Sequence, residues 1–418
     1  MNRFHKWILA EKDPEKIIQR STVWNLITSG LNSCATALII LCISWMGVQE
    51  QAGIFSLATA VAYQIQAIGF FGVRNYHIQD VKNKYSFSEY VTVNVLSSVV
   101  MVAVLVFMTF GRGYSLEKAL IVLFYSLYRA MEIYEALYHD EYQRKGRIDI
   151  GLILQTVRFL ITLSILVITM LITKNMVLAC LLAVLMSIVI IWFQNKDFYK
   201  LFDCRLRKPS KKKVKTLLLI CLPICITGFI SMYLTNASKY AIDSYLGDTT
   251  QGVFAVLFVP VFTINMLSMV IYRPYITQIS IEWHNGEVYN FLKSVGKQML
   301  VIMALTVAIT IFGYVIGLKL LGLLYHMDLL AWKWDFIVLL LGGGMNTFAV
   351  FLQQILVIVG CQNLTLLIYL FSMVATWLLS QPLVVSQGLR GASLLYLIST
   401  VVLAVGSFAV LSWRVKRK

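Results

Sequence analysis

Charged residues are scarce in this chain of 418 residues. Asp, Glu, Lys and Arg together make up 13% of the sequence, whereas hydrophobic residues make up 59%. A soluble domain of this size cannot bury so much apolar surface, so the composition excludes a soluble protein. The apolar residues form long runs between Val23 and Trp413. Runs of about 18 or more such residues match the roughly 30 Å hydrocarbon core of a bilayer. The sequence therefore predicts a polytopic membrane protein.

Cysteines with metal-ligand or redox spacing are also lacking. Among the seven cysteines, Cys221 and Cys225 fall on one face of a predicted helix, but no His or carboxylate accompanies them. We therefore interpret these cysteines as packing residues. We expect neither a metal nor a cofactor, apart from a coupling ion such as H⁺ or Na⁺.

Acidic residues are few relative to basic ones, 20 against 36, which gives a formal net charge of +16. With the N-terminus placed inside, 27 of the basic residues fall in inner segments and 6 in outer segments. This asymmetry follows the positive-inside rule and predicts that both termini are cytoplasmic. The excess charge thus sets the topology and attracts anionic lipid headgroups, and it does not indicate nucleic acid binding.

Hydropathy windows of about 19 residues predict about twelve transmembrane helices. The fourth and seventh carry charges and are the least clear. The expected spans are residues 22–46, 53–73, 87–110, 117–138, 150–172, 176–193, 217–240, 252–272, 298–321, 335–359, 364–384 and 391–413.

A basic stretch near the middle divides these spans into two sets of six. We expect an all-α membrane protein with two six-helix lobes around a central cavity. The predicted parts are a cytoplasmic segment (1–20), an N-lobe with spans one to six (21–193), a basic cytoplasmic linker (194–216), a C-lobe with spans seven to twelve (217–413) and a basic tail (414–418).

The two halves share a sequence pattern. Gly53 opens the second span, which ends at Arg74, and Gly252 opens the eighth, which ends at Arg273; each pair is 199 positions apart. An even number of spans per half keeps two repeats in the same orientation, as in two-lobed transporters. Internal duplication is therefore favoured, with chance similarity between apolar helices as the alternative.

Three charges lie near the centre and in the inner half of the fourth span: Arg129, Glu132 and Glu135. Each costs about 2.5–3.5 kcal/mol at the centre of a membrane helix, so these side chains must face partners or water. Helical spacing places Arg129 and Glu132 on one stripe with Tyr125, Ala136 and His139. Such a stripe predicts one wall of a water-accessible cavity.

Further polar stripes occur on other predicted spans. The substrate-binding candidates are Asn25, Asn32, Arg129, Gln155, Arg158 and Lys239, and the ion-coupling candidates are Glu132, Glu135 and Asp243. The arginines suit an anionic headgroup such as diphosphate, and the amides suit sugars. Alternatively, Arg129–Glu132 and Lys239–Asp243 are structural pairs within their own helices. Arg158 has no acidic residue one turn away in its helix, which favours a functional role.

Two stretches carry a resemblance to a known family. The segment from Arg129 to Gly151, followed by Arg158, resembles the junction of the fourth and fifth spans in the bacterial flippases of lipid-linked oligosaccharide repeat units. The segment from Lys239 to Gly247, followed by Gly252, resembles the boundary of their seventh and eighth spans. These flippases belong to the MOP exporter superfamily, together with lipid II flippases and MATE exporters.

The resemblance implies two six-helix lobes and a central cationic cavity in a multi-pass protein of the plasma membrane. It implies ion-coupled alternating access that carries an undecaprenyl-diphosphate-linked oligosaccharide to the outer leaflet. The expected role is surface polysaccharide biosynthesis (capsule, O-antigen, exopolysaccharide or teichoic-type polymer). The expected partners are the lipid-linked glycan, the bilayer and polysaccharide polymerase or assembly proteins, but no nucleic acid.

Two other functions remain open. A MATE-like multidrug or ion antiporter favours acidic and aromatic cavity residues, whereas this membrane core contains three cations against two central carboxylates and an outer Asp243. A membrane glycan polymerase needs a sizeable outer loop with catalytic residues, whereas the outer breaks here are short. The sequence therefore favours a transporter over an enzyme.

Overall fold

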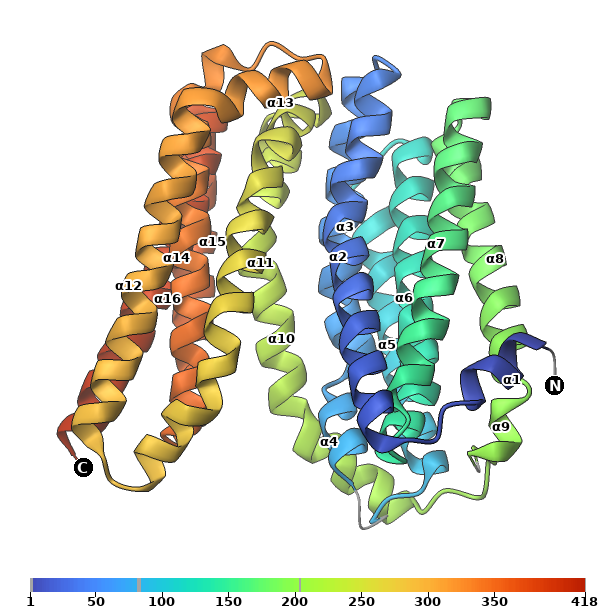
Figure 1. Ribbon diagram of the computed structural model, residues 1–418. Helices are drawn as coiled ribbons and strands as arrows, with labels where there is room; N and C mark the ends of the chain where they lie inside the picture. The colour runs from blue at the N-terminus through green and yellow to red at the C-terminus, as the bar shows by residue number, and fades with distance from the viewer. Residues whose placement is uncertain (1–2, 81–83, 203, 418) are drawn as a thin grey trace. The chain divides into compact units, whose positions relative to one another are not determined.

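The computed structural model describes residues 3–80, 84–202 and 204–417 and contains no β-strand in these ranges. The chain forms two compact units (Figure 1). The first comprises residues 1–42 and 58–229, and the second comprises residues 43–57 and 230–418. The division passes through helices α2, α3 and α10, whereas the sequence predicted a boundary at the basic linker 194–216.

The first unit is built mainly from six long helices. They are α2 (Pro14–Trp45), α3 (Gln49–Phe70), α5 (Phe87–Phe110), α6 (Leu116–Arg144), α7 (Ile148–Thr173) and α8 (Met176–Asn195). Three short helices, α1 (Arg3–Leu9), α4 (Val73–Gln79) and α9 (Phe198–Leu201), lie at the lower end of this unit in Figure 1. Helix α6 packs against α4, α5, α7 and α8, so its polar stripe lies inside the helical bundle.

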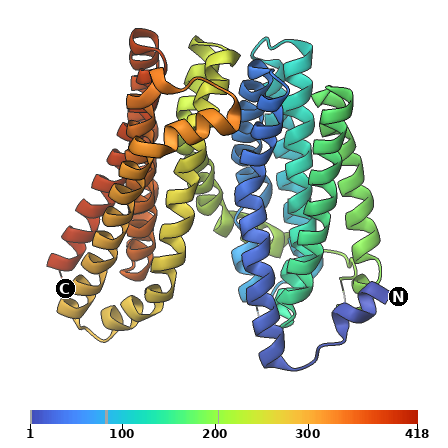
Figure 2. The same ribbon diagram turned by 45° about the horizontal axis from the view of Figure 1, so that its top comes forward.

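The second unit also contains six long helical segments (Figure 2). They are the later part of α10 (Lys211–Tyr245), whose residues 211–229 belong to the first unit, together with α11 (Asp248–His284), α12 (Val288–Phe312), α14 (Lys333–Ile358), α15 (Gln362–Gln387) and α16 (Leu389–Lys416). A π-helical turn, η1 (Gly313–Gly317), joins α12 to α13 (Leu318–Tyr325), and a 3₁₀ turn, η2 (Leu330–Trp332), precedes α14.

Eleven helical segments of the described chain are long and apolar enough to cross a membrane. Helix α6 is also long enough, with 29 residues, but its charges keep its hydropathy low. Together they account for the expected twelve spans, and the chain is a multi-pass membrane protein. The sequence placed the end of the eighth span before Pro274, whereas α11 continues through this residue to His284. A proline removes a single backbone donor, and a long helix can continue past it with a kink.

The glycines of the repeated sequence pattern meet in the structure. A Cβ atom at Gly53 would overlap the carbonyl oxygen of Asp248, and a Cβ atom at Gly252 would overlap the carbonyl oxygen of Gln49. Gly252 lies 199 positions after Gly53, and Asp248 lies 199 positions after Gln49. The first turns of α3 and α11 therefore cross in a reciprocal contact that only glycine permits on both sides.

Candidate functional site

A cavity of about 640 Å³ lies within the first unit. Helices α2, α3, α4, α6 and α7 supply its walls. Its lining comes from the early parts of α2 and α7 and from the late parts of α3 and α6. Because successive helices run in opposite directions, these parts lie at one end of the bundle, the end that carries α4. The polar lining residues are Ser21, Thr22, Asn25, Tyr63, Gln66, Arg74, Arg129, Glu132, Glu135, His139, Gln143 and Gln155.

Arg129 is held in the cavity wall by several contacts. Its Nη1 atom lies 2.6 Å from Oε1 of Glu132 and 3.5 Å from Oδ1 of Asn32. Its guanidinium carbon lies 5.0 Å from the centre of the Tyr63 ring, in a cation–π arrangement. The Nε atom has no hydrogen-bond partner among the described residues. Arg129 therefore forms the structural pair expected within its helix and also lines the cavity, while its Nε atom is buried.

Gln66 fixes the carboxylate that faces Arg129. Its Nε2 atom donates to the carbonyl oxygen of Arg129 at 2.6 Å and to Oε2 of Glu132 at 3.0 Å. A glutamine of α3 thereby connects the backbone and the side chains of α6, and the ion pair is held in one geometry.

Arg158 lies deeper than Arg129 and is not part of the cavity lining. Its Nη2 atom is 2.8 Å from Oε2 of Glu135 and 3.9 Å from Oε1 of Glu132, and both Arg158 and Glu135 are only 1% exposed. The sequence showed no acidic neighbour for Arg158 because its partners come from α6 rather than from its own helix. Its Nε and Nη1 atoms have no hydrogen-bond partner among the described residues.

The predicted candidates in the first unit gather around this cavity. Asn25 and Gln155 line it from α2 and α7, and Glu132 and Glu135 line it from α6. Asn32 does not line it but contacts Arg129.

Seven polar lining residues were not among the sequence candidates: Ser21, Thr22, Tyr63, Gln66, Arg74, His139 and Gln143. His139 lies on the predicted stripe with Arg129 and Glu132. This helical spacing could have identified His139 as a lining residue from the sequence. Arg74 comes from the short helix α4, and its Nε atom lies 3.2 Å from Oδ1 of Asp140. The formal charges on the lining thus balance, with Arg74 and Arg129 against Glu132 and Glu135.

Lys239 and Asp243 lie in the second unit, on α10, and do not line this cavity. Lys239 is 5% exposed, and its Nζ atom lies 5.3 Å from the centre of the Phe258 ring. Asp243 follows one helical turn later and is partly exposed. Among the described residues, no group of three or more His, Cys, Asp or Glu side chains is arranged to hold a metal ion.

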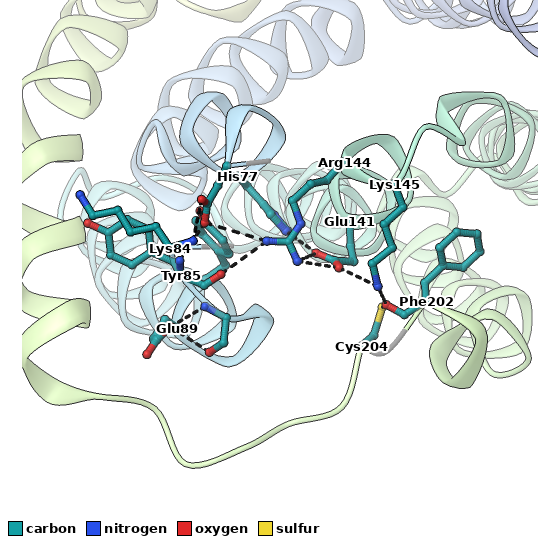
Figure 3. A network of polar contacts seen from close by, with 12 residues as sticks. His77, Lys84, Tyr85, Glu89, Glu141, Arg144, Lys145, Phe202 and Cys204 are labelled. Atoms are coloured by element: carbon teal, nitrogen blue, oxygen red, sulfur yellow. Dashed lines mark hydrogen bonds and ion pairs between the residues drawn. The ribbon is translucent and has the colours of Figure 1, made fainter. Parts of the chain in front are cut away.

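A polar network ties the base of the first unit to the segment that follows α8 (Figure 3). Nε2 of His77 and Oε2 of Glu141 are 3.0 Å apart, and Nη2 of Arg144 lies 2.7 Å from the same carboxylate. Lys145 donates from Nζ to the carbonyl oxygen of Phe202. Burial lowers the pKa of His77, although the contact with Glu141 opposes this effect.

The following segment is also attached to the start of α5. The amide of Arg207 donates to Oγ of Ser88 at 2.6 Å, and the amide of Ser210 donates to Oε1 of Glu89 at 3.3 Å. These bonds anchor the chain between α9 and α10 to the first unit.

No family model matches the chain, and no curated protein matches it. Several solved structures do. An inward-facing multidrug resistance MATE transporter of the MOP superfamily matches with a TM-score of 0.69 at 16% identity, over 95% of each chain. A MOP superfamily transporter from Pyrococcus furiosus, whose reversed binding-pocket polarity suggests a different function, matches with a TM-score of 0.61 at 15% identity, over 100% of this chain and 98% of the other.

A eukaryotic MATE transporter matches with a TM-score of 0.60 at 10% identity, over 97% of this chain and 99% of the other. Identities this low carry information about the fold and not about the substrate. The chain therefore has the fold of the MATE transporters of the MOP superfamily.

Proposed function

We propose that the protein is a flippase that carries an undecaprenyl-diphosphate-linked oligosaccharide across the plasma membrane for surface polysaccharide biosynthesis. The transport fold and the cavity of the first unit support this proposal. Both termini would be cytoplasmic, and transport would be coupled to an ion.

The observation that carries the proposal is the placement of Arg129. Arg129 lines the cavity, and its guanidinium is held beside Glu132 and the ring of Tyr63. A guanidinium is always charged and presents a planar fork of donors that matches phosphate oxygens. The amides of Asn25, Gln66 and Gln155 line the same cavity and suit the hydroxyl groups of a sugar.

A MATE-like exporter of organic cations is the second candidate. Two carboxylates, Glu132 and Glu135, and the aromatic ring of Tyr63 line the cavity, and such groups attract cations. In addition, the structures with the same fold include multidrug transporters. The two candidates therefore differ in which member of the Arg129–Glu132 pair contacts the substrate.

The test is translocation in proteoliposomes that contain the full-length protein. One probe is a short-chain polyprenyl diphosphate that carries a fluorescent N-acetylhexosamine, and the other is ethidium. We expect Arg129→Ala to slow the diphosphate probe about 10- to 100-fold, which corresponds to about 1.5–3 kcal/mol for a charge-assisted hydrogen bond. Arg129→Lys should retain part of the activity, and Glu132→Gln should retain most of it because the guanidinium remains. Arg112→Ala, at an exposed arginine, is the matched control.

A cation exporter predicts the opposite pattern. Ethidium transport would then be lost in Glu132→Gln and spared in Arg129→Ala. Transport of ethidium with no movement of the diphosphate probe would overturn the flippase proposal in favour of this second candidate.

A further inference from the structure

Lys239 differs from the arginines of the first unit in its surroundings. Arg129 and Arg158 each contact a carboxylate within 2.8 Å, whereas Lys239 forms neither an ion pair nor a hydrogen bond among the described residues. Its Nζ atom lies over the Phe258 ring, and its side chain is 5% exposed. Among the described residues, the contact that the structure gives this ammonium group is the face of one aromatic ring.

The elements around Lys239 offer little compensation. On α10 itself, Ser238 donates to the carbonyl oxygen of Ala392 on α16 at 2.6 Å, and Asp243 lies one turn away. Helix α11 contributes Phe258, and α16 contributes Tyr396, whose ring centre is 4.9 Å from that of Phe258. The remaining charged groups of these elements near this end are Asp248 on α11 and Arg390 on α16, and neither pairs with Lys239.

Buried lysine and buried arginine side chains differ in whether they can lose a proton. A guanidinium does not release its proton in a protein, whereas a buried amine readily alternates between its charged and neutral forms. The carboxylates of the first unit are poorly suited to binding and releasing a proton. Protonation of Glu132 or Glu135 would break its ion pair with a permanently charged arginine. Lys239 is thus a buried cation that can lose its charge and that has no carboxylate pair among the described residues.

We infer that Lys239 is the site that binds and releases the coupling proton of transport, rather than a contact for the substrate headgroup. This inference rests on the proposed transport function and names H⁺ as the coupling ion. The lone pair of the neutral amine takes one proton from water to form the ammonium, and the ammonium later returns that proton to water. Only an N–H bond forms and breaks.

Lys239→Arg tests this role because it keeps the positive charge and removes the ability to release the proton. The diphosphate probe and ethidium are each followed in proteoliposomes with and without an imposed pH gradient of either sign. We expect Lys239→Arg to retain probe movement without a gradient and to lose its stimulation by the gradient. Lys239→Met should behave alike, whereas Lys293→Arg, at an exposed lysine of α12, should respond to the gradient as the unmodified protein does.

A second measurement does not depend on the substrate. Lysine Nζ signals are recorded by ¹⁵N NMR on the protein in nanodiscs, and the Lys239 signal is identified by its absence in Lys239→Arg. We expect this signal to move between the ammonium and amine positions over the pH range of the transport assay, while that of Lys293 stays at the ammonium position.

The outcomes separate the two proposals. Failure of both probes to move would count against the proposed function, and the NMR titration would still decide the inference. Retained gradient stimulation in Lys239→Arg, or a Lys239 signal that never leaves the ammonium position, would overturn the assignment of the proton to Lys239.

Discussion

Replacing Arg158 with alanine removes one half of a buried ion pair. The Nη2 atom of Arg158 lies 2.8 Å from Oε2 of Glu135, and each residue is 1% exposed. For unit charges at this distance, Coulomb's law with an effective dielectric constant of about 20 gives roughly 6 kcal/mol. Relaxation around the remaining charge reduces the loss, and removing one partner of a buried pair typically costs about 3–5 kcal/mol. We therefore expect Arg158→Ala to lower the free energy of unfolding by about 3–5 kcal/mol, with reduced protein in the membrane.

A double variant also removes the carboxylate of Glu135, which Arg158→Ala leaves without its partner. Arg158→Met with Glu135→Leu replaces the pair by apolar side chains, and the double variant should recover most of the loss. The measurement is equilibrium unfolding in mixed micelles, with Arg112→Ala as the control at an exposed arginine. If Arg158→Ala changed the free energy of unfolding no more than Arg112→Ala, or if the double variant were no more stable than the single one, Arg158 and Glu135 would not form the pair described here.

Three further predictions test other parts of the structure. Gly53→Ala and Gly252→Ala should each destabilise the fold by about 1–3 kcal/mol because the new methyl group overlaps a backbone carbonyl. The control is Gly296→Ala, whose methyl group meets nothing within 4 Å and which should be neutral or slightly stabilising in thermal unfolding. Gln66→Leu removes the donor to Glu132 and to the carbonyl of Arg129, and it should slow the diphosphate probe while lowering stability by about 1 kcal/mol; equal loss in a variant of exposed Gln19 would contradict this reasoning. The hydrogen bond with His5 holds the pKa of Asp197 below its usual range. Asp197 therefore stabilises the fold fully at pH values above its pKa in the unfolded chain, which is about 4. This stabilisation is lost as the pH falls through the lower pKa of Asp197 in the folded protein. The difference in Tm between the unmodified protein and Asp197→Asn should therefore shrink on acidification, and a difference that grows would refute the sign.

Much of the fold and one wall of the site could be predicted from the sequence because both depend on periodicity. Apolar runs of membrane-spanning length gave the twelve spans, including α6 despite its charges. The spacing of Tyr125, Arg129, Glu132, Ala136 and His139 placed them on one stripe, and all of them except Tyr125 line the cavity. A helical repeat is a local property, so a single chain segment carries all the information that this prediction needs.

Contacts between helices could not be predicted in this way. The partner of Arg158 belongs to a helix that precedes it in the chain, and nothing in the spacing within α7 points to Glu135. The same is true of Gln66, which reaches α6 from α3, and of Arg74, which lies on the short helix α4 that was expected to be the end of a span. Pair geometry between helices depends on how each helix rotates about its axis, and apolar periodicity fixes this rotation only coarsely.

The crossing of α3 and α11 has an evolutionary consequence. Gly53 approaches the carbonyl of Asp248 while its counterpart Gly252 approaches that of Gln49, so both positions close the same contact from opposite sides. If the two halves descend from one six-helix ancestor that paired with its own copy, this glycine met itself across a symmetry axis. A side chain gained at either glycine would overlap the backbone of the other segment, so each half of the chain limits the residues that the other half can accept.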